Sequence, residues 1–126
     1  ERQGGDAHVI DDLDLLPSAP VVRDFVSPAD GYVTSLDARK VGLAAVQLGA
    51  GRMTVDDGVD PAVGFDVRCR VGGAVERGQP LVCVHAADEA SATRAEERLG
   101  AALELADTPA EAMPLILDRV RTRSRP

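Results

Sequence analysis

Aromatic residues are the scarcest class in this sequence. Phe25, Tyr32 and Phe65 are the whole set, 2% of the 126 residues, and tryptophan is absent. Proteins that bind single-stranded nucleic acid stack its bases on aromatic side chains, and cages for cationic ligands use the same side chains. The composition therefore argues against both kinds of site. The core must be built from valine, leucine and alanine instead.

Cysteine and histidine are scarce and lack the spacing of a structural metal site. Cys69 and Cys83 do not form a Cys-x-x-Cys pair, and the two histidines are His8 and His85. A structural zinc ion needs four such ligands at close spacing, so we expect no metal site and two free thiols in a reducing compartment. No nucleophile lies beside His85 in the sequence. We interpret it as a strand-end histidine hydrogen-bonded to the backbone rather than as a general base.

Positive charge and long hydrophobic runs are missing from most of the chain. Residues 1–118 carry ten basic residues against 21 acidic ones, since four arginines fall within the last eight positions. An acidic surface repels phosphate, so we expect no nucleic-acid partner, and we interpret the arginine-rich tail as an exposed terminus. No stretch approaches the roughly 18 apolar residues that span a membrane. We therefore expect no membrane partner and a cytoplasmic protein.

Three segments differ in composition. Residues 1–19 begin without methionine and hold two glycines, an acidic run and a proline, so we interpret them as a linker from a missing upstream domain. Residues 20–108 carry the periodic patterns of a folded domain. Residues 109–126 form a C-terminal extension with the arginine-rich tail, in which residues 115–117 are a candidate last strand.

The first half of the folded domain predicts two strands and a helix. β-branched residues at 21–26 and 32–36 indicate strands, and the proline, aspartate and glycine between them indicate a tight loop. Asp37 is well placed to cap the first main helix, at about 37–48. This helix is apolar on nearly every side, which indicates that more than one neighbour covers it.

The second half predicts two more strands and a second helix. Apolar and charged residues alternate over 63–71, the pattern of a half-buried strand, and residues 81–85 form an apolar strand. Small apolar residues at helical spacing place the second main helix at about 88–106. The order of elements predicts an α+β fold with a small mixed or antiparallel sheet.

A glycine-rich loop is the candidate site. Gly49, Gly51 and Arg52 follow the first helix, whereas glycines that cradle phosphate precede the helix whose amides face the anion. We therefore interpret the glycines as the end of the helix, with Arg52 free to reach a phosphate or a substrate from the side. The aspartates that follow lack the ligand spacing of a calcium loop, and we interpret them as turn-forming residues: Asp56, Asp57 and Asp60.

Residues 71–81 resemble the hairpins of biotinyl and lipoyl carrier domains. Those domains hold the cofactor on a lysine at the tip of a hairpin. The single lysine of this sequence, Lys40, lies in the first turn of the predicted helix instead. The carrier interpretation fails on this residue, and we expect no cofactor.

Five segments, taken together and in order, resemble the C-terminal domain of bacterial thymidine and pyrimidine-nucleoside phosphorylases. They are residues 31–33, 36–44, 48–52, 59–64 and 78–89, and the third reads Leu48-Gly49-Ala50-Gly51-Arg52. The resemblance covers roughly residues 20–108, and an ordered set of motifs is far more specific than any one of them. It implies the fold called the α/β hammerhead, in agreement with the order of elements read above.

The resemblance also implies a parent reaction. Phosphate, as a co-substrate, attacks C1′ of thymidine or a related nucleoside and releases the base and a pentose 1-phosphate. In that family the side chains that bind phosphate and base lie in the N-terminal and central domains, and no segment here matches their motifs. We therefore expect no catalytic residue in this chain. The implied partners are those missing domains, in a homodimeric parent enzyme.

These expectations combine into one functional prediction. The chain is a non-catalytic C-terminal domain whose helix at 37–48 caps the central α/β domain, with the loop of Gly49, Gly51 and Arg52 near the lip of the substrate cleft. Two alternatives stay open. One is a stand-alone interaction or scaffold module without enzymatic activity, and the other is a carrier domain modified at Lys40.

Overall fold

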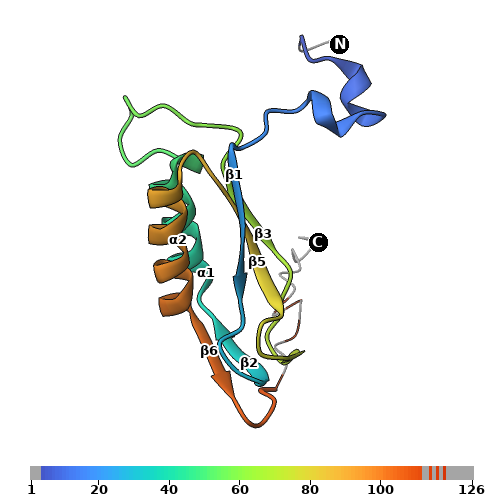
Figure 1. Ribbon diagram of the computed structural model, residues 1–126, viewed down its shortest axis with the longest axis vertical. Coiled ribbons are helices and arrows are strands. Elements are labelled where there is room, and N and C mark those ends of the chain that lie inside the picture. Colours follow the sequence, from blue (N-terminus) through green and yellow to red (C-terminus); the bar gives the residue numbers. More distant parts are fainter. Residues whose placement is uncertain (1–3, 112–113, 115, 117, 119–126) are drawn as a thin grey trace, which may run out of the picture.

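The computed structural model describes residues 4–111, 114, 116 and 118. They form a small α+β domain in which a layer of two helices lies beside two three-stranded antiparallel sheets (Figure 1). The elements are β1 (Val21–Val26), β2 (Gly31–Leu36), α1 (Ala38–Ala45), β3 (Gly64–Val67), β4 (Ala74–Val75), β5 (Pro80–Ala86), α2 (Glu89–Ala102) and β6 (Leu103–Ala106). Two short 3-10 helices precede β1, at Ala7–Ile10 and Leu13–Leu15. The predicted α+β class is confirmed.

The first sheet has the order β1-β5-β3 and is built around its central strand. Each residue of β5 from Leu81 to Val84 is at most 5% exposed. A strand that is covered on both faces is expected to be continuously apolar rather than alternating. The prediction of an apolar strand at 81–85 is therefore confirmed.

The two predicted strands at the start of the domain are confirmed, and they belong to different sheets. β1 pairs with β5, whereas β2 is the central strand of the second sheet, between β4 and β6. The chain crosses from one sheet to the other at Ser27, which is 1% exposed. The Ser27 backbone N–H donates to the Gln79 carbonyl at 2.9 Å, and its hydroxyl donates to the Ala29 carbonyl at 2.7 Å. These bonds satisfy the polar groups that the crossing buries.

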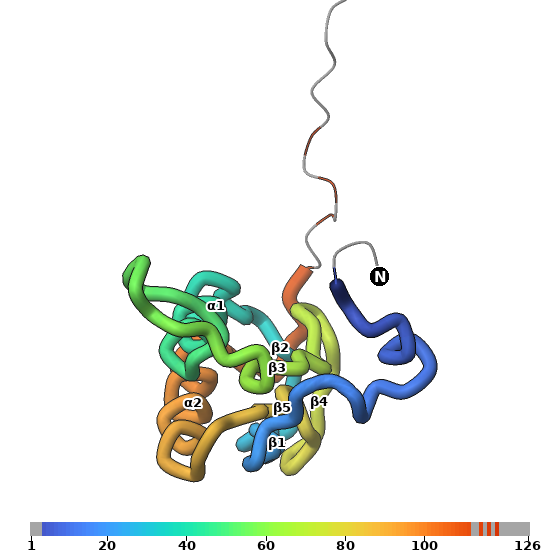
Figure 2. The backbone as a smooth tube through the Cα atoms, turned by 90° about the horizontal axis from the view of Figure 1, so that it is seen from above, coloured from blue at the N-terminus to red at the C-terminus, as the bar shows by residue number. Residues whose placement is uncertain are grey.

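The first helix begins where the sequence predicts. The Asp37 carboxylate accepts hydrogen bonds from the backbone N–H groups of Arg39 and Lys40, both at 3.0 Å. α1 ends at Ala45, and the next five residues, Val46–Ala50, form a single π-helical turn. Figures 1 and 2 show α1 and α2 side by side in one layer.

The prediction for the second helix is wrong at its C-terminal end. α2 ends at Ala102, and the next four residues form β6, which pairs with β2. The backbone of Leu103 is extended, with φ −103° and ψ 135°. Leu103 fits the helical period of the preceding residues, but Leu103 and Leu105 equally fit the alternation of a strand. The open edge of β2 decides between them, because pairing there satisfies backbone groups that would otherwise lack partners.

The predicted strand at 63–71 is too long. β3 ends at Val67, which is 41% exposed, and Val71 is 36% exposed, so neither belongs to a buried strand face. After β3 the chain crosses to the second sheet, where the N–H of Gly72 donates to the Val33 carbonyl at 2.7 Å. Gly72 has a φ of +83°, which favours glycine at this turn. The alternating pattern gave no sign of this crossing.

The core lies between the helix layer and the sheets and is aliphatic. Its most buried members come from β2, β5 and α2: Val33, Leu81, Val82, Val84, Ala86, Ala92 and Leu99. Phe25 and Phe65 pack against its margin. Within the described part of the chain, no helix is long and apolar enough to cross a membrane. The candidate strand at 115–117 lies mostly outside the described residues.

Candidate functional site

The glycine-rich loop begins within the π-helical turn, and both of its glycines have backbone roles. Gly49 has a φ of +115°, a conformation that side chains rarely adopt. A Cβ atom on Gly51 would lie 2.8 Å from Cγ2 of Val46, which is too close for a real contact. The carbonyl of Gly49 accepts a hydrogen bond from the N–H of Asp60 at 2.9 Å, so the two ends of the loop are tied together. Both glycines are needed for the chain to leave the helix in this direction.

Asp57 braces the loop from inside. One carboxylate oxygen accepts from the N–H of Met53 at 2.9 Å and of Thr54 at 2.8 Å, and the other accepts from the Thr54 hydroxyl at 2.8 Å. Because these bonds favour the charged carboxylate, they lower the pKa of Asp57. The bracing is present at neutral pH and is lost as the pH falls through that lowered pKa. The turn-forming interpretation is confirmed for Asp57, and Asp60 likewise accepts from the N–H of Ala62.

The braced loop presents one cation and three apolar side chains to solvent. Arg52 is exposed and makes no hydrogen bond or ion pair with the described residues. The exposed fractions of Met53, Val55 and Val59 are 64%, 88% and 46%. The loop can therefore offer a guanidinium to an anion and an apolar surface to a partner. The Thr54 hydroxyl and the Asp57 carboxylate of this loop bond to each other, and Arg52 is the cation that the loop offers.

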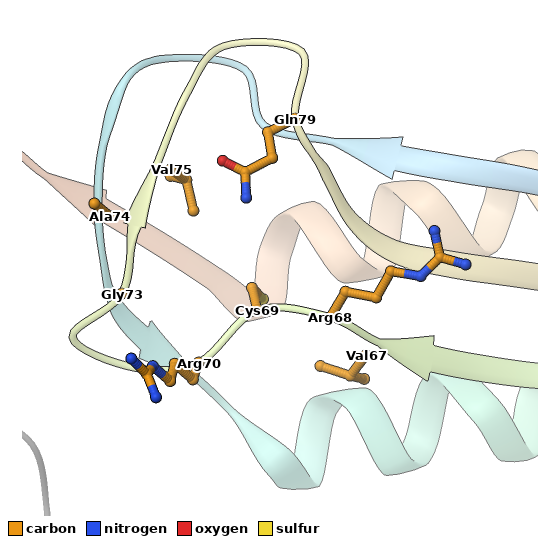
Figure 3. Close-up of a pocket in the computed structure, with 8 residues that line it drawn as sticks. All are labelled: Val67, Arg68, Cys69, Arg70, Gly73, Ala74, Val75 and Gln79. Atoms are coloured by element: carbon orange, nitrogen blue, oxygen red, sulfur yellow. The ribbon is translucent and has the colours of Figure 1, made fainter.

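A cavity of about 430 Å³ lies at the other end of the domain, between the end of β3 and the turn around β4 (Figure 3). Its lining includes Cys69, Arg70 and Gln79, and Figure 3 shows Arg68 pointing out of it. Arg68 pairs with Asp66 at 3.0 Å instead. Burial raises the pKa of the Cys69 thiol, which keeps it in its less nucleophilic protonated form. Apart from the glycines of its hairpin, no residue pattern in the sequence indicates this cavity.

The remaining candidate site residues, Lys40 and His85, do not lie together. Lys40 lies on α1, where its Nζ donates to the Ala101 carbonyl at 3.0 Å, so no lysine stands at the hairpin tip. His85 lies in β5 between Val22 and Gly64, and its ring makes no hydrogen bond with the described residues. The predicted side-chain bond of His85 to the backbone is therefore wrong.

The thiols and carboxylates do not assemble a metal site among the residues that the structure describes. Cys69 and Cys83 are free, and no group of three or more potential ligands was found there. Burial raises the pKa of Cys83, which lies opposite Asp24 and Asp66 on the neighbouring strands. The described residues thus offer a braced binding loop and a separate cavity.

Comparison with known proteins places the domain in a family. The family described as "Pyrimidine nucleoside phosphorylase C-terminal domain" matches residues 32–106. A pyrimidine-nucleoside phosphorylase of Geobacillus stearothermophilus is 39% identical over 118 residues, 94% of this chain and 27% of the relative. A thymidine phosphorylase of Burkholderia cenocepacia is 40% identical over 118 residues, again 27% of the relative. A pyrimidine-nucleoside phosphorylase of Bacillus subtilis is 43% identical over 86 residues, which are 68% of this chain and 20% of the relative.

The chain spans about a quarter of the length of these relatives. The matched family region begins in β2 and ends with the last residue of β6, so it includes both helices and the candidate loop. The match covers more than half of the chain and agrees with the ordered motifs. The chain therefore belongs to the pyrimidine nucleoside phosphorylase C-terminal domain family.

Proposed function

We propose that this chain is a non-catalytic C-terminal domain of a thymidine or pyrimidine-nucleoside phosphorylase, with the α/β-hammerhead fold. The observation that carries the proposal is the share of the relatives that it matches, 27% of their length. The exposed guanidinium of Arg52, on the loop of Gly49 and Gly51, supports a role of this loop in binding an anion. The parent reaction, phosphorolysis of a pyrimidine nucleoside, would take place in the other three quarters. Cytoplasmic location and a homodimeric parent belong to the same proposal.

The sequence predicts that the helix at 37–48 docks onto a partner domain because it is apolar on nearly every side. Packing within this chain already explains that apolar character. Ala44 and Leu48 are 1% and 8% exposed within this chain, where α2 lies alongside α1. Leu43 is the large apolar side chain that α1 leaves open, at 45% exposure. Support of the catalytic part is therefore better assigned to another surface of the domain.

A chimera tests the proposal. This chain replaces the matching part of the Geobacillus pyrimidine-nucleoside phosphorylase, to which it is 39% identical over 118 residues. The chimera is expected to catalyse phosphorolysis of thymidine, whereas the isolated chain is expected to release no thymine. A folded chimera without activity would refute the proposal, and so would thymine released by the isolated chain.

In the same chimera, Arg52→Ala is expected to raise KM for phosphate or nucleoside, or to lower kcat, by roughly three- to tenfold. A positioned guanidinium near the cleft lip stabilises an anion through charge-assisted bonds, and alanine removes them. Steady-state kinetics at varied phosphate and thymidine measure the change. Arg77→Ala is the matched control, because Arg77 is exposed at the turn after β4, at the opposite end of the domain. Wild-type kinetics for Arg52→Ala would dismiss the role of the loop.

A further inference from the structure

Two segments at one end of the molecule each expose several large apolar side chains. Figure 1 shows the segment before β1 and the loop after α1 at the same end, on either side of the start of β1. Each of the apolar residues there is between 46% and 88% exposed. We call this set the apolar end: Ile10, Leu13, Leu15, Leu16, Val22, Met53, Val55 and Val59.

The apolar end is not explained by packing within the domain. None of its residues belongs to the core cluster or packs against it. The two 3-10 helices contact each other, and neither has a buried residue. Single exposed apolar residues are normal on protein surfaces, but each of these two segments exposes several within a short stretch, which is typical of an interaction site. The loop is also held in place by Asp57, so its apolar side chains are presented in a fixed arrangement.

The same end is strongly acidic. The two segments of this end carry Arg52 and seven carboxylates: Asp6, Asp11, Asp12, Asp14, Asp56, Asp57 and Asp60. Asp6 pairs with His8, and Asp57 and Asp60 hold backbone groups of the loop. Asp11, Asp14 and Asp56 make no ion pair with the residues that the structure describes. A surface that matches this end must be apolar at its centre and carry lysine or arginine around it.

We propose that the apolar end docks onto an apolar patch, rimmed by basic residues, on the rest of a phosphorylase polypeptide. This inference rests on the proposed function. It goes further by naming the docking surface and the chemistry of the surface it meets. The relatives supply the occupant, because about three quarters of their length lies outside the part that matches this chain. The chain also enters β1 directly from this end, which places the docking surface next to the connection between the two parts.

The exposed surface of α1 and α2, called the helix face here, serves as the comparison for the apolar end. A shallow hollow of about 200 Å³ lies between α1 and α2, and its lining includes Lys40, Leu43 and Arg98. This face is cationic and exposes one large apolar side chain, Leu43. It therefore lacks both properties of the apolar end.

Single substitutions in the chimera test the proposal. Leu15→Asp and Val55→Asp place a carboxylate in the docked surface, and Leu43→Asp is the matched control on the helix face. The half-life of phosphorolysis activity at a fixed inactivating temperature is expected to fall roughly tenfold or more for the first two variants. For Leu43→Asp it is expected to stay within about twofold. In the isolated chain, the melting temperatures of Leu15→Asp and Val55→Asp should match that of the parent, because both side chains are exposed there.

A charge reversal tests the proposed basic residues around the apolar patch of the partner surface. Asp56→Lys in the chimera is expected to shorten the half-life several-fold at 0.15 M salt. The difference should shrink at 1 M salt, where the Debye length is about 3 Å. A half-life that is unchanged or longer for Asp56→Lys would overturn the basic rim.

The outcomes separate the two proposals. An unmodified chimera that folds but is inactive refutes the proposed function and, with it, the docking surface. An active chimera in which Leu15→Asp and Val55→Asp behave like Leu43→Asp leaves the proposed function standing and refutes the docking surface. Melting of the isolated chain at lower temperature in these two variants would also refute it, since the side chains would then serve the fold of this domain.

Discussion

Replacing Leu99 by alanine is expected to lower the free energy of unfolding of the isolated chain by about 3–4 kcal/mol. Leu99 lies on α2, is 1% exposed and belongs to the central core cluster. Its truncation removes apolar area from the core and leaves a cavity that the neighbouring strands cannot fill without moving. A small domain has a total stability of about 5–15 kcal/mol, so this single change removes a large part of it.

Urea unfolding followed by circular dichroism measures the loss. Leu43→Ala is the matched control, because Leu43 is also helical but 45% exposed, and it should cost less than about 1 kcal/mol. Equal costs for the two substitutions would contradict the assignment of the core to the space between α2 and the sheets.

Replacing Gly31 by alanine is expected to destabilise the domain by about 2–3 kcal/mol. Gly31 opens β2 with a φ of +152°, and a Cβ atom there would lie 2.8 Å from the carbonyl oxygen of Ala106. That oxygen belongs to the backbone of β6, so the strand pair must move apart to make room. The new methyl group would thus disturb the sheet that the end of α2 leads into.

Gly64→Ala is the control for this prediction. Gly64 opens β3, its φ is outside the left-handed region, and a Cβ atom there would meet nothing within 4 Å. Alanine at Gly64 should therefore leave the urea midpoint nearly unchanged or raise it slightly. If Gly31→Ala were as stable as Gly64→Ala, the close approach of β2 and β6 would be wrong.

Local signals predicted the starts of the elements well. The sequence predicts Asp37 as the cap of the first helix, and its carboxylate accepts hydrogen bonds from backbone N–H groups there. A cap acts over three or four residues, so the sequence contains all the information that it needs. The apolar strand β5 was equally clear, because burial on both faces leaves a continuous apolar run.

The predicted ends of α2 and β3 are wrong because contacts with distant segments of the chain determine where these elements end. Leu103 suits a helix and a strand equally, and the edge of β2, about 70 residues earlier, selects the strand. The alternation after Val67 continues through a crossing between sheets that is fixed by the bond of Gly72 to Val33. Neither partner can be read from the local pattern.

The candidate loop was predicted in part. Its glycines were expected at a helix end, and the positive φ of Gly49 agrees with that interpretation. The bracing by Asp57 was expected only as a turn, and the contact that forbids a side chain at Gly51 depends on the π-helical turn. The apolar end could not be found from the sequence, because its two halves lie about 40 residues apart and no local pattern indicates that they lie at the same end of the domain.

The most direct test of the account is the rate of thymidine phosphorolysis by three proteins measured side by side. They are the Geobacillus relative without its matched part, the chimera that carries this chain in that place, and this chain alone. We expect thymine release by the chimera and none by the truncated relative or the isolated chain. Full activity of the truncated relative, or thymine release by the chain alone, would contradict it.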